Sequence, residues 1–207
     1  MVVTRPNLKP GKGYVDGKVA LVRVQKKTRA IRNSKNRPAG TIVTEDTTTS
    51  NPSFRESVTP ELKKQFRKYK WPKNKTKLIQ ADNADAWNKA FPECIEEFNA
   101  EGGTQLHITP QPGQSPITNL CDLLTINAIK AYVRKYNGYK MHATGDMIWE
   151  ATQSAWKNLE PYKLEIAYRL WDRNIDQLIE KEGGRIKNQH TGIRKEVLKI
   201  HNQYKKM

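Results

Sequence analysis

Two aspartates occupy positions that could support metal-ion chemistry. Asp82 follows a short segment of β type, residues 77–80, and Asp122 lies in the first turn of a helix that we expect to begin at Asn119. Thirty-nine residues separate the two aspartates. Enzymes that transfer phosphoryl groups hold two metal ions about 4 Å apart with carboxylates from different elements, and Mg²⁺ prefers such oxygen ligands. Asp82 and Asp122 are therefore candidate catalytic and metal-binding residues.

Both aspartates also fit ordinary structural roles. Asp82 followed by Asn83 is typical of a turn or of a helix N-cap. Asp122 occupies the third position of a helix capped by Asn119, where the helix dipole favours an acid. The residues alone leave the catalytic and the structural interpretation of each aspartate open.

The elements that must position these aspartates follow from the apolar periodicity. Residues 1–13 and 33–51 are rich in polar residues, Pro and Gly, and we expect them to be irregular. Thr59 is the predicted N-cap of the first helix, with Pro60 at its first position. We expect strands within residues 18–31, 77–80 and 105–109, and helices over residues 59–70, 86–100, 119–136, 144–158 and 161–181. This alternation predicts an α/β fold in which helices flank a sheet.

Positive charge is concentrated at the two ends of the chain. The 207 residues include 37 Lys and Arg against 21 Asp and Glu, for a net charge of +16. Residues 1–40 contain 11 basic residues and one acid, residues 183–207 contain seven and one, and residues 41–182 are neutral overall. Two basic ends around a neutral body favour binding to a polyanion, of which nucleic acid is the commonest. A solubilising surface is the alternative.

Composition excludes several classes of protein. The longest strictly apolar run, residues 19–22, is far short of the ~20 residues that cross a bilayer, and the start of the chain has no signal-peptide pattern. Cys94 and Cys121 are too few and too far apart for a disulfide framework or a common zinc finger. The four histidines are scattered, and the sequence has no Gly-x-Ser-x-Gly motif. We therefore expect neither a membrane partner nor a small-molecule substrate.

A series of short motifs resembles the mariner-like transposases, in the branch whose last two catalytic aspartates are separated by the same interval. Residues 16–19 (DGKV) are similar to that family's F-D-G-K-I-G strand start, and residues 34–41 (SKNRPAGT) to its S-x-N-R-P-A-G-T loop. Residues 70–72 (KWP) and 79–84 (IQADNA) resemble K-W-P and I-Q-Q-D-N-A, and residues 111–122 resemble Q-P-x-x-S-P-D-x-N-x-x-D-L. Gly183, Gly184 and His190 resemble the family's closing G-G-N…P-H stretch, so the motifs occur in the family's order and cover nearly the whole chain.

The resemblance implies an RNase H-like mixed sheet flanked by helices, incomplete at the N-terminus, with a C-terminal helical extension. It divides the chain into a partial catalytic core over residues 1–140 and a helical extension with a basic tail over residues 141–207. It makes Asp82 and Asp122 ligands of Mg²⁺ or Mn²⁺ in a site that cleaves and transfers DNA strands. It also implies DNA as the partner, the nucleus as the location and a homodimer as a candidate assembly.

Ten cations are the candidate DNA-binding residues. They belong to the basic N-terminal part of the chain and to one face of the helix expected over residues 59–70. Such cations contact phosphates, which position DNA without reading its sequence. The ten are Lys26, Lys27, Arg29, Arg32, Lys35, Arg37, Lys63, Lys64, Arg67 and Lys68.

The chain departs from the family's pattern where catalysis depends on it. The family's first catalytic Asp lies in a D-E-K-W-F strand upstream of the D-G-K segment, and the sequence begins after that point. Trp87 also replaces the His that usually follows the second catalytic Asp. With two of the three metal ligands, we expect an N-terminally truncated copy that does not cleave DNA, because phosphoryl transfer depends on well-placed metal ions. A non-catalytic DNA-binding protein derived from a transposase and a basic RNA-binding protein are the alternatives.

Overall fold

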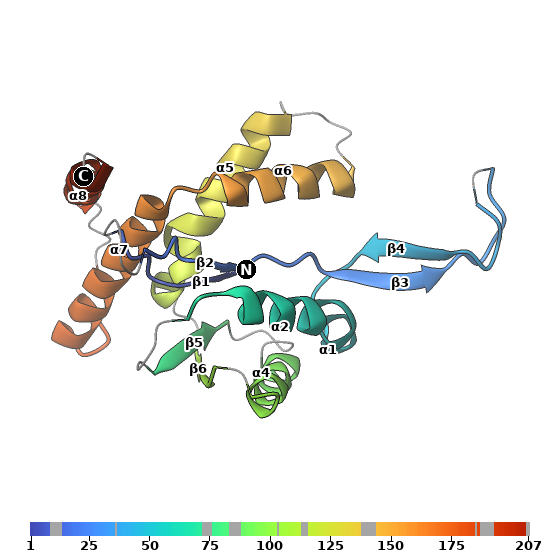
Figure 1. Cartoon of the computed structure of the whole chain (residues 1–207), viewed down its shortest axis with the longest axis horizontal. Helices are drawn as coiled ribbons and strands as arrows, with labels where there is room; N and C mark the ends of the chain where they lie inside the picture. The colour runs from blue at the N-terminus through green and yellow to red at the C-terminus, as the bar shows by residue number, and fades with distance from the viewer. Residues whose placement is uncertain are drawn as a thin grey trace. The chain divides into compact units, whose positions relative to one another are not determined.

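The computed structural model describes residues 1–8, 14–35, 37–71, 76–82, 88–102, 104–112, 116–137, 144–184, 186 and 193–205. The protein is of mixed α/β type, with 54% helix and 17% strand, so the predicted class is confirmed at this level. The described strands form three separate two-stranded sheets instead of the single sheet that we predicted. The chain divides into two compact units, one of Met1–Leu21 with Gln111–Met207 and one of Val22–Pro110 (Figure 1). The predicted division at residue 140 separates a catalytic core from a helical extension. This functional division stays a prediction.

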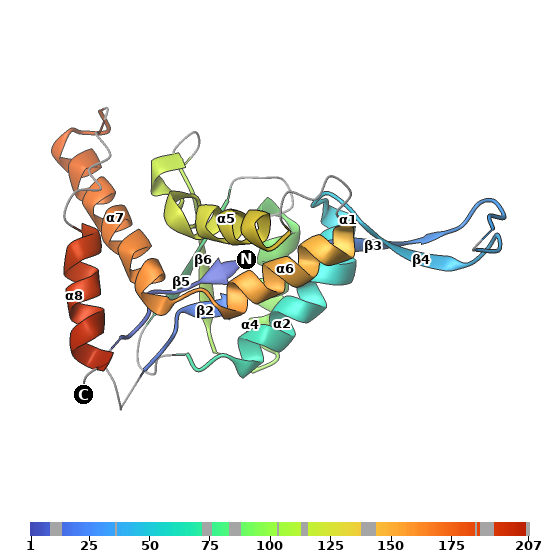
Figure 2. The same cartoon turned by 90° about the horizontal axis from the view of Figure 1, so that it is seen from above.

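The first unit is mainly helical. Its short strands pair antiparallel, with Val2 opposite Ala20. Helices α7 and α8 lie side by side (Figure 2), and Ile166 and Leu170 of α7 form a buried cluster with Ile193 and Val197 of α8. The elements are β1 (Val2–Val3), β2 (Lys18–Ala20), the 3-10 turn η2 (Pro116–Thr118), the π-helical turn η3 (Cys121–Thr125), α5 (Ile126–Asn137), α6 (Gly145–Lys157), α7 (Pro161–Glu180) and α8 (Ile193–Lys205).

The second unit is built around an aromatic core. Phe54 and Phe91 meet edge to face with ring centroids 6.0 Å apart, and Phe66 and Phe98 do so at 5.6 Å, the arrangement that aromatic quadrupoles prefer. All four side chains are fully buried. The elements are β3 (Gln25–Arg29), β4 (Ile42–Asp46), α1 (Asn51–Ser53), the π-helical turn η1 (Phe54–Val58), α2 (Thr59–Lys68), β5 (Lys77–Ala81), α4 (Ala90–Ala100) and β6 (Leu106–Pro110).

The first helical run begins at Asn51, earlier than predicted. Ser50 is its N-cap, because the Ser50 hydroxyl accepts from the Ser53 N–H and the Ser53 hydroxyl accepts from the Ser50 N–H. Thr59 is therefore not an N-cap. Its N–H donates a hydrogen bond to the carbonyl of Phe54, which completes the π-helical turn. A proline ring crowds the preceding helical turn and offers no N–H. The widened turn just before Pro60 lets the helix continue through it.

Strands β5 and β6 form a parallel pair connected through α4. The register runs from Lys77 opposite Leu106 to Ala81 opposite Pro110. Asn99 of α4 binds the start of β6 twice, since its amide donates to the Leu106 carbonyl (2.9 Å) and accepts from the Leu106 N–H (3.0 Å). The two strands and the helix predicted here are confirmed, and β5 carries Asp82 at its carboxyl end.

Three elements escaped prediction. Strand β1 lies within the residues 1–13 that we expected to be irregular, and β4 within residues 33–51. Strand β4 has no buried residue, so its sequence lacks the alternation of apolar and polar side chains that marks a half-buried strand. Helix α8 lies in the basic tail, where Ile193 and Val197, four residues apart, form its buried face. No described helix is long and apolar enough to span a membrane.

Candidate nucleic-acid interface

Strands β3 and β4 form an antiparallel ribbon that has no buried face. Five residue pairs run in register from Gln25 opposite Asp46 to Arg29 opposite Ile42, and no residue of either strand is buried. Five residues of antiparallel strand span about 17 Å. In both views the ribbon extends away from α1 and α2 of its own unit (Figures 1 and 2). We call residues 23–47 the hairpin arm.

The hairpin arm carries six of the ten candidate DNA-binding cations. Five are exposed and Arg37 is half-buried. None of the six forms an ion pair with an acid in the described part of the chain. Glu45 lies opposite Lys26 in the register, but no ion pair joins them. The six are Lys26, Lys27, Arg29, Arg32, Lys35 and Arg37.

Hydrogen bonds hold both ends of the hairpin arm. At the base, Arg23 binds Asp46 through two donors, at 2.5 Å and 2.7 Å, and this hydrogen bonding keeps the pKa of Asp46 below its usual value. At the other end, Gly40 donates to the carbonyl of Ala30 at 2.7 Å, and the Asn33 side chain accepts from the Ala39 N–H at 2.6 Å. The connection between the strands is therefore a folded loop.

The four candidate cations of α2 have different surroundings. Lys63 forms ion pairs with Glu97 and Glu101 of α4, both at 2.8 Å, and its side chain is only 15% exposed. Arg67 also pairs with Glu101. These hydrogen bonds raise the pKa of Lys63 and lower that of Glu101. Of the remaining two cations, Lys64 pairs with Glu61 at 3.3 Å, whereas Lys68 is exposed and pairs with no described acid.

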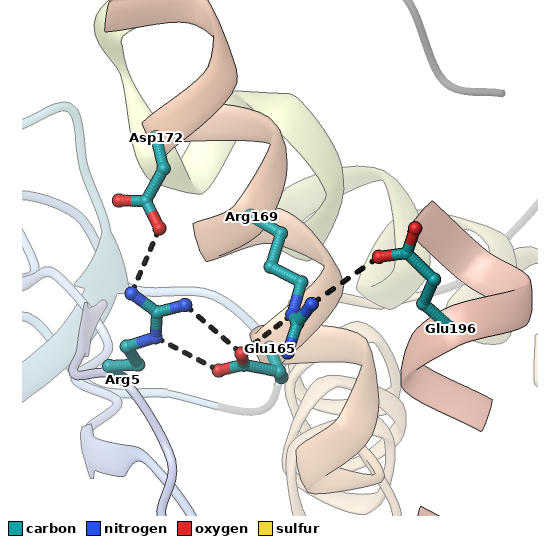
Figure 3. Close-up of polar contacts among 5 residues, drawn as sticks. All are labelled: Arg5, Glu165, Arg169, Asp172 and Glu196. Atoms are coloured by element: carbon teal, nitrogen blue, oxygen red, sulfur yellow. Dashed lines mark hydrogen bonds and ion pairs between the residues drawn. The ribbon is translucent and has the colours of Figure 1, made fainter. Parts of the chain in front are cut away.

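Two cations of the basic N-terminal part, Arg5 and Lys18, form hydrogen bonds within the first unit. Figure 3 shows the guanidinium of Arg5 bound to Glu165 by two hydrogen bonds and to Asp172 by a third. The same Glu165 accepts from Arg169 at 3.0 Å, and Arg169 reaches Glu196 of α8 at 3.4 Å.

Lys18 is used in a similar way. Its ammonium group donates to the carbonyls of Lys157 and Leu159, at 3.0 Å and 3.2 Å. Arg5 and Lys18 thus stabilise the fold of their own unit, and part of the N-terminal charge is not available to a partner.

The two aspartates are both exposed, and they belong to different units. Asp82 follows the carboxyl end of β5, the place where parallel sheets present ligand-binding groups. Asp122 lies in the first turn of η3, and the side chain of Asn119 just before this element accepts from the Cys121 N–H at 3.1 Å. Trp171 of α7 anchors the preceding turn by donating to the Thr118 carbonyl at 2.9 Å. The convergence of Asp82 and Asp122 on one site stays a prediction.

No group of three or more His, Cys, Asp or Glu side chains lies close enough together, within the described ranges, to hold a metal. Mg²⁺ bound by protein usually takes one or two carboxylates and completes its shell with water and substrate phosphates. Each unit contributes one of the two predicted aspartates, so neither unit alone contains the predicted pair.

A second exposed basic surface was missed in the sequence. Helix α5 contains Lys130, Arg134 and Lys135 and no acid, and these three side chains are exposed. They form no ion pair with any acid that the structure describes. The absence of Asp and Glu from residues 126–137 was the signal that could have identified them.

Comparisons with known protein families, with curated proteins and with solved structures found no match for this chain. Function must therefore be inferred from the geometry and charge of the chain itself.

Proposed function

We propose that this protein binds DNA through the hairpin arm. The observation that carries the proposal is the set of six cations on a ribbon without acid partners. Cations that neutralise phosphates release condensed counterions, and this release supplies most of the affinity of sequence-independent binding. A two-stranded β-ribbon also has the width to follow a groove of duplex DNA.

We further propose that the chain derives from a mariner-like transposase with an RNase H-like core and that it does not cleave DNA. The ordered motifs support this descent, and the SKNRPAGT segment that resembles the family's loop lies in the hairpin arm. Asp82 follows the carboxyl end of a parallel strand, and descent from this family predicts a catalytic carboxylate at that position. The resemblance assigns catalytic roles to Asp82 and Asp122 of this chain and to no third residue of it, and phosphoryl transfer depends on well-placed metal ions.

The binding proposal is tested by two variants with the same change in charge. One replaces Lys26, Lys27 and Arg29 of the hairpin arm with Gln, and the other replaces Lys63, Lys64 and Arg67 of α2 with Gln. Each lowers the net charge by three. We expect the arm variant to bind a fluorescent 30-base-pair duplex at least about 10-fold more weakly than the unchanged protein at low salt. The α2 variant should bind almost normally.

Equal losses in the two variants would contradict the proposal, because total charge and not the hairpin arm would then set the affinity. The same titration against single-stranded and double-stranded RNA tests the RNA-binding alternative. Binding to duplex RNA that is tighter than binding to duplex DNA would favour that alternative.

The absence of cleavage is tested with the full chain and supercoiled plasmid, in the presence of Mg²⁺ or Mn²⁺. We expect no nicking above the level of a buffer control. Metal-dependent nicking that is lost in Asp82→Ala would contradict the proposal and would assign Asp82 a catalytic role.

A further inference from the structure

The hairpin arm exposes two isoleucines in addition to its cations. Ile31, in the connection between the strands, is 92% exposed, and Ile42, at the start of β4, is 61% exposed. The large apolar side chains of the unit's core, such as Phe54 and Phe66, are completely buried. A single exposed apolar residue is common on protein surfaces. Ile31 differs because it lies in a cationic segment at the end of a ribbon that has no core of its own.

The loop that carries Ile31 is ordered by its own hydrogen bonds. The Ala30 N–H donates to the carbonyl of Thr41 at 2.9 Å, and the Asn33 side chain accepts from the Ala39 N–H. Gly40, with a φ of +86°, takes the left-handed conformation at the turn back into β4, which few other residues adopt at low cost. These contacts hold the backbone on both sides of Ile31 and leave its side chain in solvent.

We propose that Ile31 is a wedge that inserts between adjacent base pairs of duplex DNA and bends it. The proposal depends on the proposed function, because the cations of the hairpin arm must first bring the loop to the duplex. Proteins that bend DNA from the minor groove place Ile, Leu, Phe, Met or Pro between base steps and use nearby Arg and Asn at the groove. Arg32 and Asn33 follow Ile31 directly. Flanking cations offset the unstacking energy by contacting the phosphates that the bend brings close.

Duplex DNA fits this surface better than a protein or a membrane does. The arm has seven cations and two acids, and Arg23 binds one of these acids, so the charge of the other six cations complements a continuous polyanion. Two separated isoleucines on a ribbon of polar residues give too little apolar area for a stable protein interface. Insertion of the exposed isoleucines into a membrane, next to the cations of the arm, is the main alternative. It is one of the outcomes of the test.

The test measures bending separately from binding. A 30-base-pair duplex with a donor and an acceptor dye at its ends is titrated with the full chain, with Ile31→Ala and with Ile42→Ala. Both isoleucines are exposed, so neither change should alter folding. We expect the unchanged protein and Ile42→Ala to raise energy transfer between the dyes. Ile31→Ala should bind the duplex with an affinity within about five-fold of that of the unchanged protein, but it should not raise energy transfer. The fluorescence of a 2-aminopurine base in the duplex should increase when the unchanged protein binds, because unstacking relieves quenching of this base. The increase should be absent with Ile31→Ala.

Each alternative result has a definite meaning. Binding without bending by the unchanged protein, or equal bending by Ile31→Ala, would overturn the wedge and leave the proposed function intact. Failure of the unchanged protein to bind the duplex would overturn the proposed function. Ile31-dependent binding to vesicles of phosphatidylserine and phosphatidylcholine at physiological salt, without DNA bending, would replace the wedge with a membrane contact.

Discussion

The hairpin arm and helix α2 are two basic segments of one unit that resemble each other in sequence and differ in structure. Two of the four candidate cations of α2, Lys63 and Arg67, pair with acids of α4 and contribute to packing between helices. The cations of the arm face solvent. The partners of Lys63 lie 34 and 38 residues further along the chain, so local charge could not reveal the pairing. A run of basic residues therefore identifies a binding surface only when the acids of neighbouring elements are also known.

The apolar residues of the two segments differ in the same way. Leu62 and Phe66 of α2 are buried, and Phe66 packs against Phe98 and Trp71. The isoleucines of the hairpin arm are exposed. Helix α2 is thus part of the folded core of its unit, whereas the arm can change without loss of that core.

The largest expected effect on DNA binding comes from shortening the hairpin arm. Replacing residues 30–41 with Asn-Gly would join Arg29 to Ile42, which already pair, through a two-residue turn that suits hairpins. The change removes Arg32, Lys35 and Arg37 and keeps the ribbon register. We expect affinity for a DNA duplex to fall about 100-fold at low salt, with little change in thermal unfolding. Unchanged affinity would show that the loop does not contact DNA.

The largest expected effect on stability tests the structural role of α2. Phe66→Ala removes a fully buried ring from the aromatic core and should lower the free energy of unfolding by about 3–5 kcal/mol. Urea unfolding followed by circular dichroism measures the loss, with Ile42→Ala as an exposed control that should change it by less than about 0.5 kcal/mol. A loss in Ile42→Ala as large as that in Phe66→Ala would contradict the distinction between core and arm.

A smaller effect is expected when a cation of α2 is freed from its acid, so that it is unpaired like those of the hairpin arm. Glu101→Gln removes the carboxylate that Lys63 and Arg67 share, so Arg67 becomes available to phosphates and Lys63 keeps only Glu97 as a partner. We expect DNA affinity to rise about two- to five-fold. Glu180→Gln changes the net charge equally at an exposed site in the other unit and is the matched control. The same rise in both variants would indicate an effect of net charge alone.

The unit that contains α2 should also show a pH dependence of its stability. Burial raises the pKa of the Cys94 thiol from a usual value of 9.0 to about 11. Between these values the unfolded chain loses the thiol proton and the folded chain keeps it, so Cys94 contributes stability below pH 9 that is lost as the pH rises toward 11. Urea unfolding at pH 8 and pH 10.5 should show a smaller pH-dependent loss in Cys94→Ala than in the unchanged protein. Equal losses would show that Cys94 does not contribute.

Sequence periodicity was sufficient for elements with a buried face. Strands β5 and β6 and helices α4 to α7 were predicted because their apolar residues repeat at strand or helix spacing. Strand β4 was missed because neither of its faces is buried, and the start at Asn51 was missed because Pro60 implied a helix beginning at Thr59. Among the candidate site residues, the sequence grouped the six cations of the arm with those of α2, because it could not show that Lys63, Lys64 and Arg67 pair with acids.

The most direct test of the account is the salt dependence of DNA binding. Dissociation constants for one duplex are measured between 50 and 300 mM salt for the unchanged protein, the arm variant and the α2 variant defined above. If Lys26, Lys27 and Arg29 each neutralise one phosphate, the slope of log K against log salt should decrease in magnitude by about 2.7 in the arm variant. It should hardly change in the α2 variant. Equal slopes for the unchanged protein and the arm variant would contradict binding through the hairpin arm.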